Sequence, residues 1–282
     1  TSLPNANALS TGFSAPDREA VQSLLGKAFG NFRTHLDLLQ ESNDPEVVHQ
    51  ARVSWRRFKS AMHLFKPLLQ KDGIPANDAL QPMLKALSRL RDLDVARFQT
   101  LPKLSSAYMK GAPAHTQEWE RVTRVFASAD RQQRLALRAV LREPVIQGTL
   151  EDTSQWIAKL ASHSELFVAR DHADGALRSW ARHRVHQMHR TMRKAKANAD
   201  TAPSQHRVRI LAKHVRYSIE MLRDVFPHKT AEKWHLEAIN LQTRIGQTRD
   251  VVRANALARE LELPSDIAER LQSIASSPTG HE

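Results

Sequence analysis

The sequence predicts an all-α protein. Glycine (9 residues) and tyrosine (2 residues) are scarce, whereas the good helix formers Leu, Ala, Arg, Gln and Glu are abundant. Apolar residues recur along most of the chain at the i, i+3, i+4 spacing of an amphipathic helix. A chain of 282 residues can bury a sizeable core, either as one large domain or as two fused halves.

The first part of the chain predicts a flexible arm followed by five helices. Residues 1–16 are rich in Ser, Asn, Ala and Pro and show no helical periodicity, so we expect them to be flexible. The first helix is expected from about Asp17. Asn43 and Asp44 are candidate N-caps for a helix that starts near Pro45. In order, the expected helices cover about 17–39, 45–69, 76–90, 91 to the break at Gly111 and Pro113, and 116–142.

The second part of the chain predicts six further helices. The segment from Glu143 to Gly148 is the most natural junction, which divides the chain into halves at 17–143 and 144–275. Pro203 opens one helix of the second half, and Phe226 before a proline ends it. The expected helices cover about 150–162, 173–198, 203–226, 229–246, 249–261 and 264–273, and residues 276–282 are expected to be a disordered tail.

Basic residues repeat with the same spacing in two segments that lie 157 residues apart. Each set has intervals of three, four and three residues, which at about 100° per residue places its members on one narrow helix face. Apolar positions repeat with the same offset, so the pattern predicts an internal duplication. The first set is His49, Arg52, Arg56 and Lys59, and the second is His206, Arg209, Lys213 and Arg216.

The basic rows predict an anionic ligand. Like charges at i, i+3 and i+4 repel by a few tenths of a kcal/mol per pair, and a solvated face ordinarily mixes acids with bases. Glu220 continues the second row and makes it less pure. The helix expected just before the second row carries a third row and should pack antiparallel to it along one groove. This third row is Arg178, Arg182, His186, His189, Arg193 and Lys196. Five further arginines also share a face, which we interpret as surface decoration: Arg124, Arg131, Arg134, Arg138 and Arg142.

Charge and composition exclude several classes of protein. The formal net charge of +12 and the pI near 10.3 favour polyanionic partners. The absence of cysteine excludes disulfides, zinc fingers and thiol catalysis, and it fits a reducing compartment such as the cytoplasm. No apolar run approaches the roughly 18 residues of a membrane span, and residues 1–16 lack the pattern of a signal peptide. No cofactor and no metal site are expected.

Four segments together resemble the CHAD domain family: residues 49–59 (HQARVSWRRFK), 90–95 (LRDLDV), 206–220 (HRVRILAKHVRYSIE) and 241–250 (LQTRIGQTRD). The resemblance extends over about 17–273 and implies two four-helix bundles related by a pseudo-twofold axis. It also implies a basic central groove that binds inorganic polyphosphate, and the eight residues of the first two rows occupy the family's basic positions. Arg57 is replaced by His214 in the second copy. CHAD domains often accompany a triphosphate-processing domain, for which the chain has no room, so the resemblance implies a non-catalytic binding module.

Other functions remain open at this stage. A metal-dependent phosphohydrolase would use His49, His206, Asp94 and Asp250, but neighbouring cations would repel the metal. We expect Asp94 and Asp250 to cap the helices that follow them or to hold a basic side chain in place. Specific nucleic-acid recognition is disfavoured because aromatic residues make up only 6% of the chain, although weak non-specific binding is expected. A third possibility is a scaffold that contacts granule proteins and polyphosphate granules.

Overall fold

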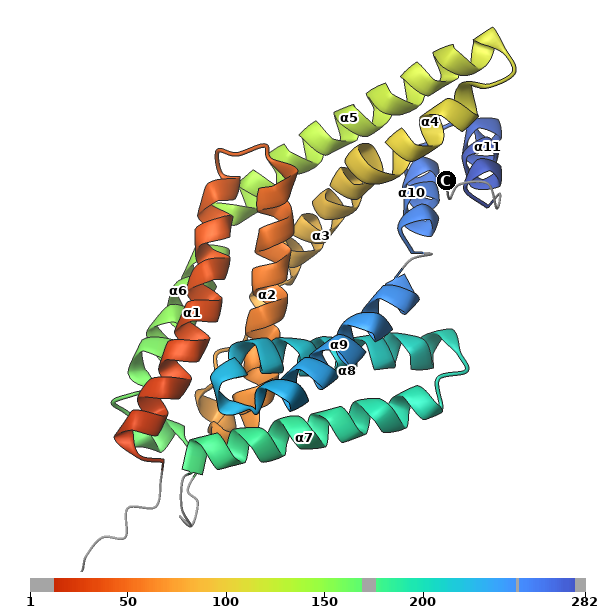
Figure 1. Ribbon diagram of the computed structural model, residues 1–282. Coiled ribbons are helices and arrows are strands. Elements are labelled where there is room, and N and C mark those ends of the chain that lie inside the picture. The colour runs from red at the N-terminus through yellow and green to blue at the C-terminus, as the bar shows by residue number, and fades with distance from the viewer. Residues whose placement is uncertain (1–12, 169–175, 247–248, 277–282) are drawn as a thin grey trace, which may run out of the picture. The chain divides into compact units, whose positions relative to one another are not determined.

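A computed structural model describes residues 13–168, 176–246 and 249–276, and confirms the all-α class (Figure 1). Within these residues β-pairing is limited to an isolated antiparallel bridge between Leu69 and Phe167. The arm at 1–16 is described only from residue 13, and the tail at 277–282 lies outside the described residues. No helix among the described residues is both long enough and apolar enough to cross a membrane.

Eleven α-helices are described in these ranges, and most lie where the periodicity predicts them. Those of the first part are α1 (Ala15–Leu39), α2 (Pro45–Phe65), α3 (Gln81–Val95), α4 (Leu101–Met109), α5 (Pro113–Leu141) and α6 (Pro144–Lys159). Those of the second part are α7 (Ala176–Ala197), α8 (Ala202–Met221), α9 (His228–Gly246), α10 (Arg249–Glu260) and α11 (Ser265–Ser276). A π-helical turn, η4 (Ala96–Thr100), joins α3 to α4.

Local chemistry explains where these helices begin. Asp44 caps α2 as predicted, because its Oδ1 accepts a hydrogen bond from the backbone N–H of Glu46 at 2.8 Å. Thr201 and Ser204 form a capping box at the start of α8. The expected loop at 143–148 is wrong: Pro144 is the first residue of α6, where its fixed φ and missing N–H are tolerated. Gly111 has a φ of +104°, which is the left-handed region that a glycine tolerates between two helices.

The chain divides into two compact units, and each is assembled from three separate segments. The first unit comprises Thr1–Gly30, Trp55–Ala76 and Glu151–Leu241, and the second comprises Asn31–Ser54, Asn77–Leu150 and Gln242–Glu282. Each unit therefore takes residues from both sides of the boundary predicted at 143. The internal duplication and the two four-helix bundles stay predictions.

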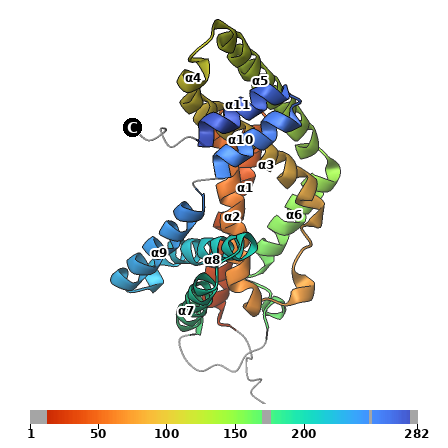
Figure 2. The same cartoon turned by 90° about the vertical axis from the view of Figure 1, so that its right-hand side faces the viewer.

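The first unit packs aromatic and aliphatic side chains of α1, α2, α7 and α8. Phe29 and Phe58 are both buried, and their ring centroids lie 4.7 Å apart. α7 and α8 lie side by side and antiparallel, joined by a short turn, as both ribbon views show (Figures 1 and 2). The expected pairing of these two helices is therefore confirmed.

The second unit has its own core, in which α3, α4 and α5 pack with α10 and α11. Buried apolar residues from these helices form one cluster that includes Leu93, Tyr108, Phe126, Leu257 and Ile267. Beside this cluster lies a buried ionic group. Arg134 donates to Asp94 at 2.5 Å and to Asp130 at 3.1 Å, and Asp130 also pairs with Arg97 at 2.9 Å.

Candidate functional site

The first basic row lies along α2, opposite the side of the helix that faces the core. Val48, Ala51, Phe58 and Ala61 are buried on that opposite side. Of the row itself, Lys59 is exposed, and the other three members are half-buried: His49, Arg52 and Arg56. The units divide α2 after Ser54, so His49 and Arg52 belong to the second unit, and Arg56 and Lys59 belong to the first. The basic row and the buried residues therefore occupy separate faces of α2, as predicted.

The second row lies along α8 and is partly neutralised at its end. His206 is exposed, and Arg209, Lys213 and Arg216 are half-buried. Glu220 accepts from the Nε atom of Arg216 at 2.8 Å, and Arg57 approaches it at 3.6 Å. Burial alone would raise the pKa of Glu220, but the bonds from His235 and Arg216 lower it below its usual value. Arg216 and Arg57 therefore already have an anionic partner in the protein.

α2 and α8 meet in the first unit through a pair of stacked histidines. The rings of His63 and His214 lie 4.3 Å apart at an interplanar angle of 16°. The Nδ1 atom of His214 also lies 3.1 Å from the hydroxyl of buried Ser60. Sequence reasoning missed this contact, because His63 and His214 do not occupy equivalent positions in the repeat. His214 does not replace Arg57 in space, since Arg57 faces Glu220.

The stacked pair is surrounded by cations, which contribute to lowering the pKa of both histidines. Burial, together with the electrostatic effects of His63, Lys59 and Lys213, lowers the pKa of His214 to about 4. Burial, Arg184 and Lys66 lower the pKa of His63 in the same way. Both imidazoles are therefore neutral at pH 7 in the free protein. A nearby anion would offset the charge of the cations and make protonation easier.

The third row lies on α7, and all its members except His189 are exposed. Arg182, His186 and Arg193 are exposed, as are Arg178 and Lys196 at the ends of the row. His189 is the exception, with 5% of its surface exposed. Its ring stacks on Trp234 of α9 at 4.6 Å, and its Nε2 atom lies 2.9 Å from a Glu237 carboxylate oxygen. His189 therefore holds α9 against α7 and is not placed to meet a ligand in solution.

A basic groove of about 440 Å³ lies between α2, α7 and α8 of the first unit. Its lining contains three cations from α7 and no carboxylate. The Nε atom of Arg184 is buried, and no described residue accepts a hydrogen bond from it. The residues that line the groove are His63, Arg184, Gln187, Met188, Arg190, Thr191, Lys194 and Leu211.

The sequence did contain a signal for this groove. Arg184, Gln187, Thr191 and Lys194 repeat the intervals of three, four and three, but only the two end residues are charged. We therefore define the cationic surface as the groove cations, His63 and the cations around the His63–His214 pair. Its members are Lys59, His63, Lys66, Arg184, Arg190, Lys194 and Lys213.

Comparison with known families decides the classification. The CHAD domain family matches residues 23–259. The chain belongs to the CHAD domain family. A crystal structure of the CHAD domain from the plant Ricinus communis superposes with a TM-score of 0.73 at 23% identity, covering 96% of this chain and 88% of that one. PptA from Streptomyces chartreusis superposes with a TM-score of 0.61 at 17% identity, covering 92% of each chain. No curated relative matches the sequence.

The segments that resemble CHAD domains lie mainly on described helices. Residues 49–59 belong to α2, 90–95 to α3 and 206–220 to α8. The fourth segment, 241–250, joins α9 to α10 and is described only in part, so the side chain of Asp250 lies outside the described residues. Two of the four CHAD-like segments therefore carry the basic rows. The 90–95 segment instead supplies Asp94 to the buried ionic group of the second unit.

The residues considered for a metal site do not assemble into one where they are described. Among the described residues, no group of three or more His, Cys, Asp or Glu side chains could hold a metal ion. Asp94 is 1% exposed and bonds to Arg134 of α5. The expected cap is wrong for Asp94, since it is the next-to-last residue of α3 and not its start. It does hold a basic side chain in place, but that side chain is Arg134 of α5, which is buried, so the surface interpretation is wrong for this arginine.

Proposed function

We propose that this CHAD-domain protein binds inorganic polyphosphate on the cationic surface and performs no chemistry on it. The observation that carries the proposal is the groove between α2, α7 and α8, which is lined by three α7 cations and His63 and contains no carboxylate. Lys59 and Lys213 lie close to the adjoining His214. Such a concentration of like charge around a groove whose lining has no carboxylate is costly in the free protein, and an anionic strand relieves it.

The chemistry of the side chains suits a phosphate chain. Arginine forms forked hydrogen bonds to phosphate oxygens, while lysine supplies a mobile point charge. Neutralisation of a flexible polyanion also releases condensed counterions, which favours binding most at low salt. The basic rows extend the surface along the helices. The additional binding residues we propose are His49, Arg52, Arg56, His206, Arg209, Arg182, His186 and Arg193, with Arg216 contributing less because Glu220 already engages it.

A binding role without catalysis is supported by the groups that face the groove. Its polar lining consists of cations, one neutral imidazole, an amide and a hydroxyl, and it offers no carboxylate as a general base or metal ligand. Polyphosphate would thus be held without a group to activate water. We place this role in the cytoplasm, at polyphosphate granules and the proteins found there.

Calorimetric titration with long-chain polyphosphate tests the proposal. The surface variant combines Lys59→Gln, Lys213→Gln, Arg190→Gln and Lys194→Gln. The matched control also removes four positive charges, but from exposed residues of the second unit: Lys103→Gln, Lys110→Gln, Arg121→Gln and Arg131→Gln. Each lost phosphate contact lowers the slope of log K against log salt by about 0.7 for a single strand. We expect a fall of about 3 for the surface variant and less than 1 for the control.

The same titration separates polyphosphate binding from general attraction to polyanions. Wild-type protein should bind polyphosphate more tightly than duplex DNA at equal phosphate concentration, because the groove accommodates a thin strand. Equal weakening by the surface and control variants would mean that net charge alone attracts the ligand. Unchanged binding by the surface variant would refute the assigned surface, and equal affinity for DNA would refute selectivity for polyphosphate.

A further inference from the structure

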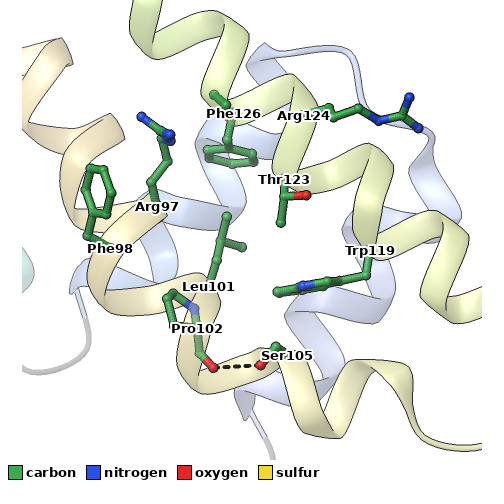
Figure 3. A pocket seen from close by; sticks show the side chains of 10 residues that line it. Arg97, Phe98, Leu101, Pro102, Ser105, Trp119, Thr123, Arg124 and Phe126 are labelled. Atoms are coloured by element: carbon green, nitrogen blue, oxygen red, sulfur yellow. Dashed lines mark hydrogen bonds between the residues drawn. The ribbon is translucent and has the colours of Figure 1, made fainter.

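A second pocket, of about 510 Å³, lies wholly within the second unit and has a different chemistry. It is formed where the π-helical turn η4 and α4 face α5 (Figure 3). Its lining is mainly aromatic and aliphatic, and its volume falls within the range of small-molecule sites. The lining residues are Arg97, Phe98, Leu101, Pro102, Ser105, Trp119, Thr123, Arg124, Phe126 and Ala127.

The base of this pocket is rigid, and one wall is exposed. Leu101 and Phe126 belong to the buried core cluster, and Trp119 packs its ring 5.2 Å from that of Tyr108. Phe98, by contrast, is 52% exposed on the π-helical turn. The wider turn interrupts the continuous helix from α3 to α4, and such turns are frequent at functional sites. The pocket therefore has a preformed apolar base beside an aromatic ring that still faces water.

The polar groups of the pocket are either satisfied or cationic. The hydroxyl of Ser105 donates to the carbonyl of Pro102 at 2.8 Å, and that of Thr123 donates to the carbonyl of Glu120 at 3.0 Å. Neither hydroxyl therefore needs a proton acceptor from a ligand. The charged groups are Arg97 and Arg124, and no carboxylate lines the pocket.

The two arginines are positioned differently. Arg97 is fixed: its Nη1 atom pairs with Asp130 at 2.9 Å, and its guanidinium lies over the Phe98 ring at 4.8 Å from the centroid. Arg124 is exposed, and its side chain extends from α5 away from Phe98 and Leu101 (Figure 3), with its Nε donating to the carbonyl of Glu120 at 3.3 Å. Arg124 is the exposed cation of the lining, and rotation of its long side chain would bring its terminal nitrogens to an anionic group held beside the apolar interior.

From this geometry we infer that the pocket binds a small amphipathic anion, namely an aromatic ring system or short acyl chain that carries one carboxylate, sulfonate or phosphate group. The apolar part would lie between Phe98 and Trp119, and the anionic group would meet Arg124. Polyphosphate does not fit this description, because it has no apolar surface to bury against these side chains. The inference is independent of the function proposed for the cationic surface.

The probe that tests the inference is 8-anilinonaphthalene-1-sulfonate, whose fluorescence increases in an apolar site. Its uncharged analogue N-phenyl-1-naphthylamine has the same ring system without the sulfonate. We expect one saturable site for the sulfonate, displaced by decanoate and not by polyphosphate. Arg124→Gln should weaken sulfonate binding about fivefold and leave the uncharged analogue unaffected, since an exposed ion pair contributes up to about 1 kcal/mol. Arg131→Gln, on the same helix, is the matched charge control.

Two further variants test the apolar part of the site. Phe98→Ala removes an exposed wall, and Ser105→Phe fills the space between α4 and α5. Both variants should abolish saturable binding of the sulfonate. Phe98→Ala should also keep a thermal unfolding temperature near that of the wild type. Binding that survives Ser105→Phe, is displaced by polyphosphate, or is absent from the wild type would overturn the inference. Dimerisation that Phe98→Ala abolishes, without sulfonate binding, would assign the pocket to a second copy of the chain and overturn it as well.

Discussion

Polyphosphate binding is expected to take up a proton at His214, and this coupling sets a specific pH dependence. In the free protein, burial and the charges of His63, Lys59 and Lys213 hold the pKa of His214 at about 4. Phosphate bound near Lys59 and Lys213 would offset these charges and raise the pKa toward the ordinary value of 6.5. Affinity should therefore increase as the pH falls below 6.5, and the increase should level off near pH 4.

The size of the effect follows from the two pKa values. If the bound value returns fully to 6.5, linkage gives a factor of about 30 at pH 5 and about 1.3 at pH 7, relative to high pH. The affinity then rises about 20-fold from pH 7 to pH 5, or about 1.8 kcal/mol. This is a ceiling, because the burial of His214 persists in the complex. The pH range over which affinity rises therefore lies lower than it would for histidines of ordinary pKa. The low pKa of His214 in the stacked pair is the physical reason.

The assay is a calorimetric titration of polyphosphate at pH 5, 6 and 7 in constant salt, with buffers of different ionisation enthalpy to count protons. His214→Gln keeps a hydrogen-bonding side chain beside Ser60 but cannot be protonated, so its pH dependence should be much weaker. His228→Gln, at an exposed position of α9, is the control. A His214→Gln profile as steep as that of the wild type would refute the reasoning, and so would a flat wild-type profile.

Stability must be checked in the same pH range, because the depressed pKa also affects folding. The unfolded chain takes up a proton on His214 near pH 6.5, whereas the folded protein does so only near pH 4. The contribution of His214 to stability is therefore lost progressively as the pH falls from about 6.5 to about 4. Far-ultraviolet circular dichroism at pH 5 should show the helical signal of pH 7, so that the change in affinity reports on binding alone.

Three further predictions concern the described helices themselves. Arg134→Leu leaves Asp94 and Asp130 buried without their shared partner, and should reduce the free energy of unfolding by about 3–5 kcal/mol in chemical denaturation at pH 7; a loss below about 1 kcal/mol would contradict this. Burial raises the pKa of Asp94 above its usual value, so its contribution to stability falls as the pH rises above about 4. Asp94→Asn should gain thermal stability relative to the wild type as the pH rises. A difference in melting temperature that stays constant with pH would exclude the ionisation of Asp94 as the cause. Gly111→Ala should destabilise by about 1 kcal/mol because φ is +104° there, whereas Gly30→Ala inside α1 should stabilise by about 0.5–1 kcal/mol. Apart from the adjacent backbone and neighbouring residues in sequence, no atom lies within 4 Å of the added methyl group at either position. Equal melting temperatures for the two variants would therefore disprove the backbone explanation.

Helical periodicity predicted most of the secondary structure, because it depends only on neighbours along the chain. The start of α2 at Pro45 and the break at Gly111 follow from residues adjacent to each boundary. The largest error, at Pro144, has a local cause as well. A proline that follows a helix can end one element or begin the next, and here it does the second, with only Arg142 and Glu143 between α5 and α6.

For the candidate site too, features that depend on one helix were predictable from the sequence, and most features that depend on packing between helices were not. The separation of the basic rows from the buried side of α2 and α8 was predictable, since both lie on a single helix. The pairing of α7 with α8 was predictable as well, but the exposure of each α7 side chain was not, because it depends on which other helices pack against α7. His189 has the correct spacing for the exposed row, but Trp234 and Glu237 of α9 bury it. Arg184, outside the long predicted row, lines the groove.

The sequence by itself determined the helical class, most helix boundaries, the family and the net positive charge, because each depends on composition, on short spacings or on ordered motifs. Only the tertiary structure decided which charges act together. It brought His63 to His214 across α2 and α8 and lowered both pKa values, and it turned Asp94 into the buried partner of Arg134. Burial and the distance between charges control both effects, and these arise only when helices distant in sequence pack together.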